Sequence, residues 1–194
     1  MAGQAAYEVI MGVGTLYIGE FSLTGAAEPS DISVNTTPQA SAWTHTGFTS
    51  DGVTFTANQT FSKMRVDQVA DAVGAKMTER AVTVATNLAQ ATLENVLYSL
   101  NTGTITTGSG FRSLEPEFDG DELQPTYRAL IFDGFAPATS AGVVKRRRFL
   151  VRKVLSVETV GIPYKKGDIT LVPVTFESFY VSTTLAPFKI VDET

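Results

Sequence analysis

The sequence predicts a mostly-β (α+β) domain with a single α-helix laid on one sheet. Apolar residues alternate with threonine and alanine around Val53 and Phe55 and again around Val82 and Val84, which is the two-residue period of a half-buried strand. Later segments rich in β-branched and aromatic residues predict longer strands. Only one segment carries an apolar stripe of helical period. One helix among many strands is typical of this fold class.

The helix is predicted over residues 88–100. Its apolar stripe is formed by Ala89, Leu93, Val96, Leu97 and Leu100. Asn87 is expected to cap the first turn, with Gln90 in the position that completes a capping box. Gly103 is expected to stop the helix.

Residues 1–194 are expected to form one domain, without an interdomain linker or a repeat. The glycine-broken segment 9–21 predicts a strand or an arm. Residues of about 22–49 are rich in Ala, Ser, Thr, Pro and Asn, and this composition predicts a long loop.

The second half of the chain predicts strands within residues 126–132, 144–160 and 169–182. Terminal arms are expected at about 1–12 and 183–194. The C-terminal arm is apolar but too short to form a core of its own, so we expect it to dock on its own domain or on a neighbour.

The composition limits the classes of function. Charged residues make up 18% of the chain, below the roughly 25% of a typical soluble domain. This fits either a surface that faces other protein or a Thr/Ser-rich surface that is soluble without charge. The formal net charge of −5 disfavours a general nucleic-acid binder, because such proteins use excess Lys and Arg to displace counterions.

Few residues are suited to catalysis or to metal binding. There is no cysteine, and the single histidine, His45, lies beside Trp43 in a polar stretch that favours a loop histidine over a catalytic base. The glycines of residues 103–110 lack the Lys-Ser/Thr pair of a phosphate-binding loop. No apolar run approaches the roughly 20 residues of a membrane span, and no signal-peptide pattern is visible. We expect a soluble protein without catalytic residues, cofactors or metal.

A basic segment is formed by Lys145, Arg146, Arg147 and Arg148, and Arg152 extends it. In a strand, three of these arginines share one face, which we expect to be the non-core side. The opposite face carries Phe149, Val151, Leu155 and Val157. Pairing with another subunit, a solvated strand face and nucleic-acid binding are all open. No aromatic residue alternates with the arginines as a base-stacking platform requires.

An acidic segment follows the helix. Its members are Glu115, Glu117, Asp119, Asp121 and Glu122. Calcium prefers such oxygen ligands, but the Asp-x-Asp-x-Asp-Gly register is absent, which favours a solvated loop or an interface patch. Arginine forms forked pairs with carboxylates across interfaces. We therefore expect the basic segment to contact the acidic segment of another subunit.

Four runs carry a resemblance to a known family. They are Gly52-Val53-Thr54-Phe55-Thr56, Val66-Asp67-Gln68, Thr83-Val84 and Asn87-Leu88-Ala89-Gln90-Ala91-Thr92-Leu93-Glu94-Asn95. In order and spacing the chain resembles the tail tube proteins of long-tailed (siphovirus-type) bacteriophages, over about residues 46–100 and elsewhere by strand order. The resemblance implies an antiparallel β-sandwich or barrel with one flanking helix and extended arms. In that family hexameric rings stack into the conduit for DNA.

The resemblance implies a structural protein of the virion tail, made in the host bacterial cytoplasm and without an enzymatic role. Its partners would be further copies of itself and the tape measure, terminator and baseplate proteins. Phage DNA would pass without specific binding, and no small-molecule substrate is expected. The alternatives are a tail terminator or contractile secretion tube, a β-sandwich adhesion module, and a hydrolase that uses Glu115 or Asp119.

The resemblance also implies a lumen along which DNA moves without adhering. A wall rich in Lys and Arg would hold phosphates, so we expect Thr, Ser and acidic side chains there. Thr54, Thr56 and Thr83 are the candidates, because they alternate with the predicted core residues of their strands. The arginines are expected at subunit contacts instead.

Overall fold

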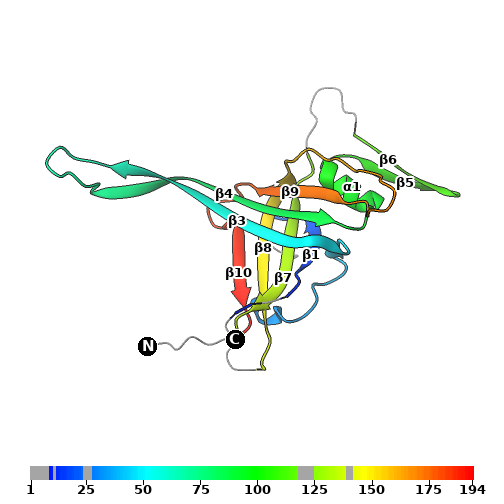
Figure 1. Cartoon of the computed structure of the whole chain (residues 1–194), viewed down its shortest axis with the longest axis horizontal. Helices are drawn as coiled ribbons and strands as arrows, with labels where there is room; N and C mark the ends of the chain where they lie inside the picture. The colour runs from blue at the N-terminus through cyan, green and yellow to red at the C-terminus, as the bar shows by residue number, and fades with distance from the viewer. Residues whose placement is uncertain (1–8, 11, 24–27, 118–124, 139–141) are drawn as a thin grey trace.

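The computed structural model describes residues 9–10, 12–23, 28–117, 125–138 and 142–194 (Figure 1). The elements in these residues are β1 (Thr15–Glu20), η2 (Asp31–Ser33), β2 (Trp43–His45), β3 (Thr49–Met64), β4 (Gly74–Leu88), α1 (Leu93–Leu100), β5 (Thr104–Gly108), β6 (Phe111–Glu115), β7 (Arg128–Ala136), β8 (Lys145–Ser156), β9 (Val172–Ser178) and β10 (Phe188–Asp192). The mostly-β fold with one α-helix is therefore confirmed.

One antiparallel sheet organises the molecule. Its strand order is β2-β1-β7-β8-β9-β4-β3, and β10 pairs with β8 beside this path. The hairpin of β5 and β6 forms a separate two-stranded sheet. The predicted loop of residues 22–49 thus contains strand β2, and the predicted C-terminal arm contains strand β10.

Strand β8 has two partners along the same edge. Its first part, from Arg147 to Val151, pairs with β10, and its last part pairs with β9. A bulge in β8 between Val151 and Val154 separates the two parts. It places both valines in one core cluster, and Val157 lies exposed beyond the strand. The prediction that Val157 shares the core face with Val151 is wrong, because the bulge changes the alternation.

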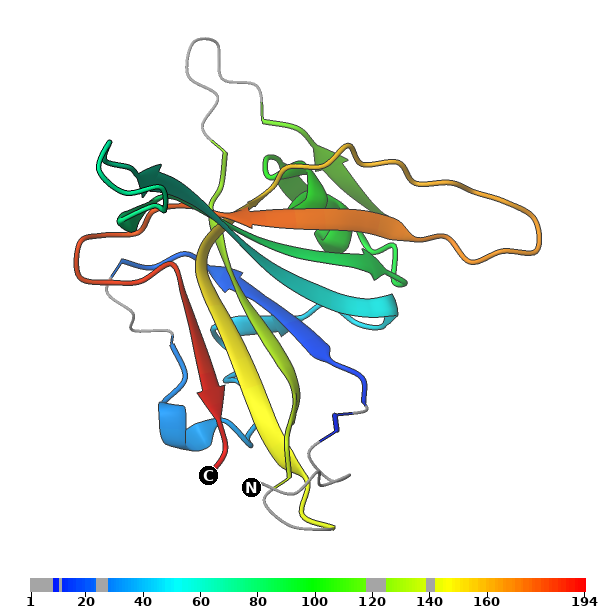
Figure 2. The same ribbon diagram turned by 60° about the vertical axis from the view of Figure 1, so that its left-hand side comes forward.

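The core lies inside the curl of the sheet. Leu16 and Ile18 of β1 share one buried cluster with Val84 and Leu88 of β4, although β7, β8 and β9 lie between these strands in the sheet. Figure 1 shows β3 and β4 running across β7 and β8, and Figure 2 shows the two groups of strands diverging from one end of β8. Each fully buried side chain of this size contributes about 1.5–3 kcal/mol. The curled sheet therefore supplies both layers of its own core.

A second, smaller cluster lies on the opposite face of β7 and β8. It consists of Trp43, Ala129, Ile131 and Leu150. The segment of residues 28–45, which we call the strap, lies over this face and contributes Trp43. Because the strap covers it, this face is a second interior and not a solvated surface.

The helix begins later than the sequence predicted. Leu88 is the last residue of β4, where it pairs with both Thr49 and Val172 and is fully buried. These contacts hold Leu88 in the sheet, so the prediction of a start there is wrong. The side chain of Thr92 caps the helix by accepting from the backbone N–H of Asn95 at 3.2 Å.

The predicted cap and stop differ from the structure, and of the predicted apolar stripe Val96 packs against the main core cluster. The helical residues that lie buried are the polar Asn95 and Ser99, and Leu100 is exposed. The amide of Asn95 donates to the carbonyl oxygens of Thr46 and Gln90 at 2.8 and 2.7 Å. Asn101, in the left-handed conformation, ends the helix. The helix therefore docks through hydrogen bonds as well as apolar contact.

Strands β3 and β4 continue beyond the core as a long hairpin. We call residues 57–80 of this hairpin the arm. Figure 1 shows it projecting far from the rest of the chain. Its residues are exposed, apart from Gly74, which is half-buried. The arm gives no strand pattern in the sequence, because both of its faces are exposed and apolar and polar residues therefore do not alternate along it.

Candidate assembly surfaces

Arg148 is buried, with 4% of its surface exposed, and its charge is paired within the chain. Its Nε and Nη2 donate to the two carboxylate oxygens of Asp133, each at 2.6 Å. Nη1 and Nη2 also donate to the carbonyl oxygens of Ser33 and Thr36 at 3.3 and 2.7 Å. This forked pair is the strong geometry of an Arg–carboxylate contact. Arg148 therefore fastens the strap to β7 and β8.

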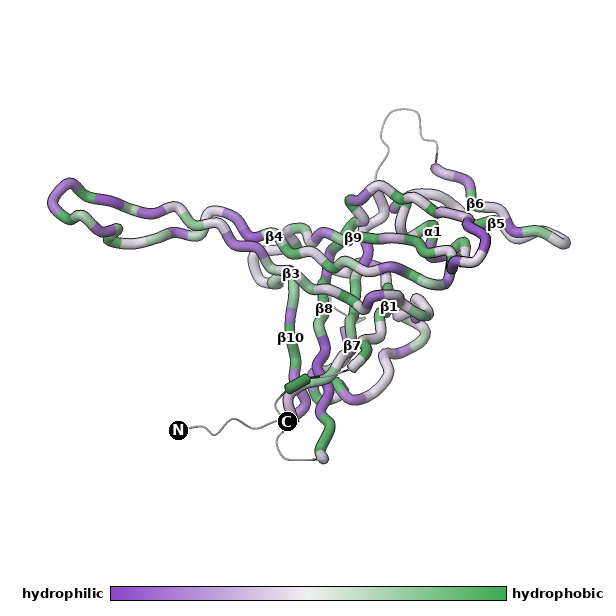
Figure 3. The backbone as a smooth tube through the Cα atoms, viewed as in Figure 1, coloured by the Kyte–Doolittle hydropathy of each residue, from purple (hydrophilic) through white to green (hydrophobic). Residues whose placement is uncertain are grey.

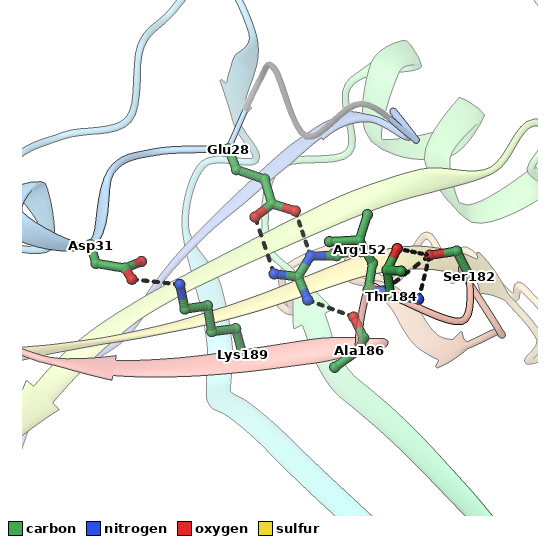
Figure 4. A network of polar contacts seen from close by, with 8 residues as sticks. Glu28, Asp31, Arg152, Ser182, Thr184, Ala186 and Lys189 are labelled. Atoms are coloured by element: carbon green, nitrogen blue, oxygen red, sulfur yellow. Dashed lines mark hydrogen bonds and ion pairs between the residues drawn. The ribbon is translucent and has the colours of Figure 1, made fainter.

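Arg152 makes a second fork to the strap (Figure 4). Its Nε and Nη2 donate to Glu28 at 2.5 and 3.1 Å, and its Nη1 donates to the carbonyl oxygen of Ala186 at 2.5 Å. Lys189 of β10 pairs with Asp31 of the strap. The strap, β8 and the segment before β10 are thus joined by charge-assisted hydrogen bonds.

The prediction that these arginines lie on a non-core side is wrong for Arg148 and Arg152. Arg152 is only 8% exposed, and Leu150 lies between the two arginines in the second core cluster. The sequence concealed this interior, because Trp43 stands in a segment whose composition predicts a loop.

Arg147 pairs with the C-terminal strand. Its Nε and Nη2 donate to the carboxylate of Asp192 at 2.6 and 2.7 Å. These hydrogen bonds lower the pKa of Asp192 below its ordinary value and raise the pKa of Arg147. The stabilisation is therefore present above the unfolded-state pKa of Asp192 and is lost as the pH falls through the folded-state value.

Lys145 and Arg146 begin β8. The Nζ of Lys145 donates to the backbone oxygen of Thr194 at 3.0 Å. The guanidinium of Arg146 lies 4.8 Å from the ring centroid of Phe135, within the range of a cation–π contact. Arg146 is exposed and Lys145 half-buried. These two residues are thus the accessible part of the basic segment.

The acidic segment lies beyond α1. Glu115 ends β6 opposite Thr104, and both Glu115 and Glu117 are exposed. Three members lie outside the described residues: Asp119, Asp121 and Glu122. Nearby, an ion pair joins Arg112 of β6 to Glu94 of α1, and its hydrogen bond lowers the pKa of Glu94. The β5–β6 hairpin is thereby tied to the helix.

No ion pair among the described residues joins the basic segment to Glu115 or Glu117. Sequence analysis missed the carboxylates that the arginines use, which are Glu28, Asp133 and Asp192. One of these partners follows from the pairing of β7 with β8, because Asp133 lies directly opposite Arg148 in that hairpin. The predicted strand stopped at residue 132, one position short of it.

The three candidate threonines lie on one face of the sheet. Thr56 pairs with Thr83, and Thr54 pairs with Ala85, on the side opposite the core residue Val84. Thr54 and Thr56 are exposed and Thr83 is half-buried. Strand β9 continues the face with Pro173, Thr175 and Glu177.

We call this surface the threonine face. Its members are Thr54, Thr56, Asn58, Ala81, Thr83, Ala85, Asn87, Pro173, Thr175 and Glu177. It includes one carboxylate and no basic residue. Glu158 adds a second carboxylate at its border, where Thr175 donates a hydrogen bond to it. The face is therefore small, polar and weakly acidic.

The arm carries large apolar side chains that lie exposed in the part of the chain that the structure describes. They are Phe61, Met64, Val66, Val69, Val73 and Met77. Figure 3 shows hydrophobic segments mixed with hydrophilic ones along it. Phe61 lies opposite Met77 in the register, and exposed apolar side chains that are neighbours on a projecting element are typical of a surface that contacts other protein.

The described residues include no group of three or more His, Cys, Asp or Glu side chains arranged to hold a metal ion. His45 accepts a hydrogen bond from the backbone N–H of Gly47 at 2.8 Å and packs edge-on against Tyr17. Both contacts are structural. No helix in the described ranges has the length and apolar character needed to cross a membrane.

The model of the phage tail tube protein family matches residues 1–193. The chain belongs to this family. No curated protein matches it. The resemblance drawn from residues 46–100 is therefore confirmed and extends over nearly the whole sequence. As a tail tube protein, the chain is a structural component of the phage tail.

The buried fork of Arg148 yields a stability prediction for the tail tube protein. Asp133→Ala is expected to lower the free energy of unfolding by about 3–5 kcal/mol, because it leaves a buried guanidinium without its carboxylate. The matched control, Asp192→Ala, removes the partner of Arg147, whose ion pair lies partly in solvent, and is expected to cost about 0–1 kcal/mol. Urea unfolding of both variants compares them. An equal loss in the two would contradict the role given to the fork.

Proposed function

We propose that this tail tube protein assembles into six-fold rings that stack into the tail tube of a siphovirus-type phage, through which DNA is ejected. The observation that carries the proposal is the projecting arm, whose large apolar side chains are exposed among the described residues. The partners are further copies of the chain along the tube, with tape measure, terminator and baseplate proteins of the same tail. The role is structural and not enzymatic.

The open edge of the sheet supports self-association. Strand β3 is the last strand of the sheet, so among the described strands its outer edge is unpaired along Thr49–Met64. A long exposed edge invites pairing with another chain, and closure into a barrel removes it. Contacts between unlike surfaces form rings when the rotation closes and open filaments when it does not. In a stack of rings, the contacts within each ring close, and the contacts between rings continue as an open filament.

Replacing one aromatic residue of the arm tests whether the arm contributes to assembly. Phe61→Ser is expected to weaken assembly about tenfold or more, because an exposed phenyl ring that becomes buried contributes about 1.5–3 kcal/mol per contact. The matched control is Phe111→Ser, which alters another exposed phenylalanine outside the arm. Negative-stain microscopy and sedimentation measure the assembled fraction. Normal rings and tubes from Phe61→Ser would contradict the role of the arm, and a wild-type protein that stays monomeric at high concentration would overturn the proposed function.

We also propose that the threonine face lines the lumen, with Thr54, Thr56 and Thr83 among its members. Short polar side chains and the carboxylate of Glu177 offer no cation to hold phosphates by counterion release. The formal net charge of −5 per chain adds to the repulsion of DNA in every ring. The accessible arginines then lie at subunit contacts.

Chemical labelling tests this orientation, because the natural chain has no cysteine. A Thr56→Cys variant is expected to react with a small maleimide both before and after assembly. A maleimide carried on a particle wider than the tube is expected to label only the free subunit. Labelling of assembled tubes by the large reagent to the same extent would place Thr56 on the outside.

We further propose that Lys145 and Arg146 contact the acidic segment of a neighbouring subunit, at Glu115, Glu117, Asp119, Asp121 and Glu122. Arg147, Arg148 and Arg152 have intrachain carboxylates, so they support the contact by positioning β8. Exposed pairs contribute only about 0–1 kcal/mol each, but the contact is repeated around every ring.

Charge reversal tests the contact without disturbing the buried forks. Lys145→Glu with Arg146→Glu is expected to reduce assembly several-fold and to leave the melting temperature of the free subunit nearly unchanged. Adding Glu115→Lys and Glu117→Lys to the same chain is expected to restore assembly, because the charges are then exchanged. Wild-type assembly of the first variant, or no recovery in the second, would contradict the pairing.

A further inference from the structure

The sulfur atoms of this chain have an unusual distribution. The chain contains four methionines and no cysteine. Two of these methionines, Met64 and Met77, lie in the described residues, and both belong to the arm. They are 54% and 44% exposed. Thioethers are normally buried core fillers, so their exposure on one projecting element is a specific feature of this protein.

The two methionines occupy both faces of the arm. Met77 lies directly opposite Phe61 in the register. Met64 lies three positions further along β3, which places it on the other face, opposite Gly74. The Met64 methyl group fills the space beside Gly74, since a Cβ added there would lie 2.7 Å from Met64 Cε. A change at the two sulfurs therefore alters both surfaces that the arm presents.

We propose that Met64 and Met77 form an oxidation site whose state decides whether the arm can be buried against another copy of the chain. Each thioether sulfur attacks one oxygen of a peroxide, the O–O bond breaks, and the products are a methionine sulfoxide and water when the oxidant is hydrogen peroxide. The sulfur is oxidised and the peroxide is reduced. The sulfoxide is polar and disrupts apolar contacts.

The effect on assembly rests on the proposed function. Burying a sulfoxide oxygen without a hydrogen-bond donor is unfavourable, as for any unpaired polar group. Each oxidised sulfur that enters a contact is expected to weaken it about tenfold. Assembly in turn slows the oxidation, because an arm that is buried against another copy shields its sulfur atoms from peroxide. Oxidation and assembly thus exclude one another, and reduction of the sulfoxides reverses the block.

Peroxide treatment of the free subunit and of assembled tubes tests the inference. Mass spectrometry is expected to find sulfoxide at Met64 and Met77 in the free subunit and at least tenfold slower oxidation in tubes. The treated subunit is expected to keep its near-ultraviolet circular dichroism and to lose assembly. The control variant, Met64→Leu with Met77→Leu, preserves apolar volume and is expected to assemble both before and after treatment. Methionine sulfoxide reductases for both sulfoxide epimers, supplied with a dithiol that is oxidised to a disulfide as each sulfoxide returns to a thioether and water, are expected to restore the treated wild type.

The outcomes separate the two proposals. Untreated wild-type protein that forms no rings or tubes would overturn the proposed function, and this inference with it. Untreated protein that assembles, with oxidised protein assembling equally well, would overturn the inference alone. Loss of assembly by the peroxide-treated leucine variant would also overturn it, because the damage would then lie elsewhere in the chain.

Discussion

The bulge in β8 is the constraint on which the rest of this structure depends. It separates the part of the strand that pairs with β10 from the part that pairs with β9. Because β9 pairs only with the part of β8 beyond the bulge, the branch of β9, β4 and β3 runs across β7 and β8 (Figure 1), and its residues share one core cluster with those of β1. The same branch continues past the core, where no second layer covers it. The arm is the part of β3 and β4 that extends past the pairing with β9, which covers only Thr83–Leu88 of β4.

The charged residues of β8 strengthen this arrangement from the other side. Arg148 and Arg152 hold the strap over the second core cluster, and Arg147 holds the end of β10. A basic run that looks like a binding surface in the sequence is thus used largely inside the subunit. Among the exposed surfaces of the described residues, the arm presents large apolar side chains together with polar ones, and the threonine face presents small polar side chains.

The elements that follow from a local period of apolar residues could be predicted from the sequence, whereas the features that depend on contacts between distant residues could not. Strands β4, β7, β8 and β9 follow from alternating or β-branched runs, and the family follows from the order of the short segments before the helix. The helix start was misplaced because Leu88 is held in the sheet by Val172, a residue far away in the chain. The composition of the strap predicts a loop, because the burial of Trp43 depends on its distant contact with Leu150. Among the candidate sites, the threonine face could be predicted from alternation, whereas the partners of the arginines required the fold.

Hydrogen exchange along β3 and β4, measured in free subunits and in assembled tubes, tests the central claim most directly. In the free subunit the amides of residues 57–80 are expected to exchange much faster than those at Val82 and Val84, because the arm has no buried contacts. In tubes the arm is expected to gain protection of at least about tenfold, which corresponds to burial against another copy. Arm amides that exchange equally fast in free subunits and in tubes would contradict the account.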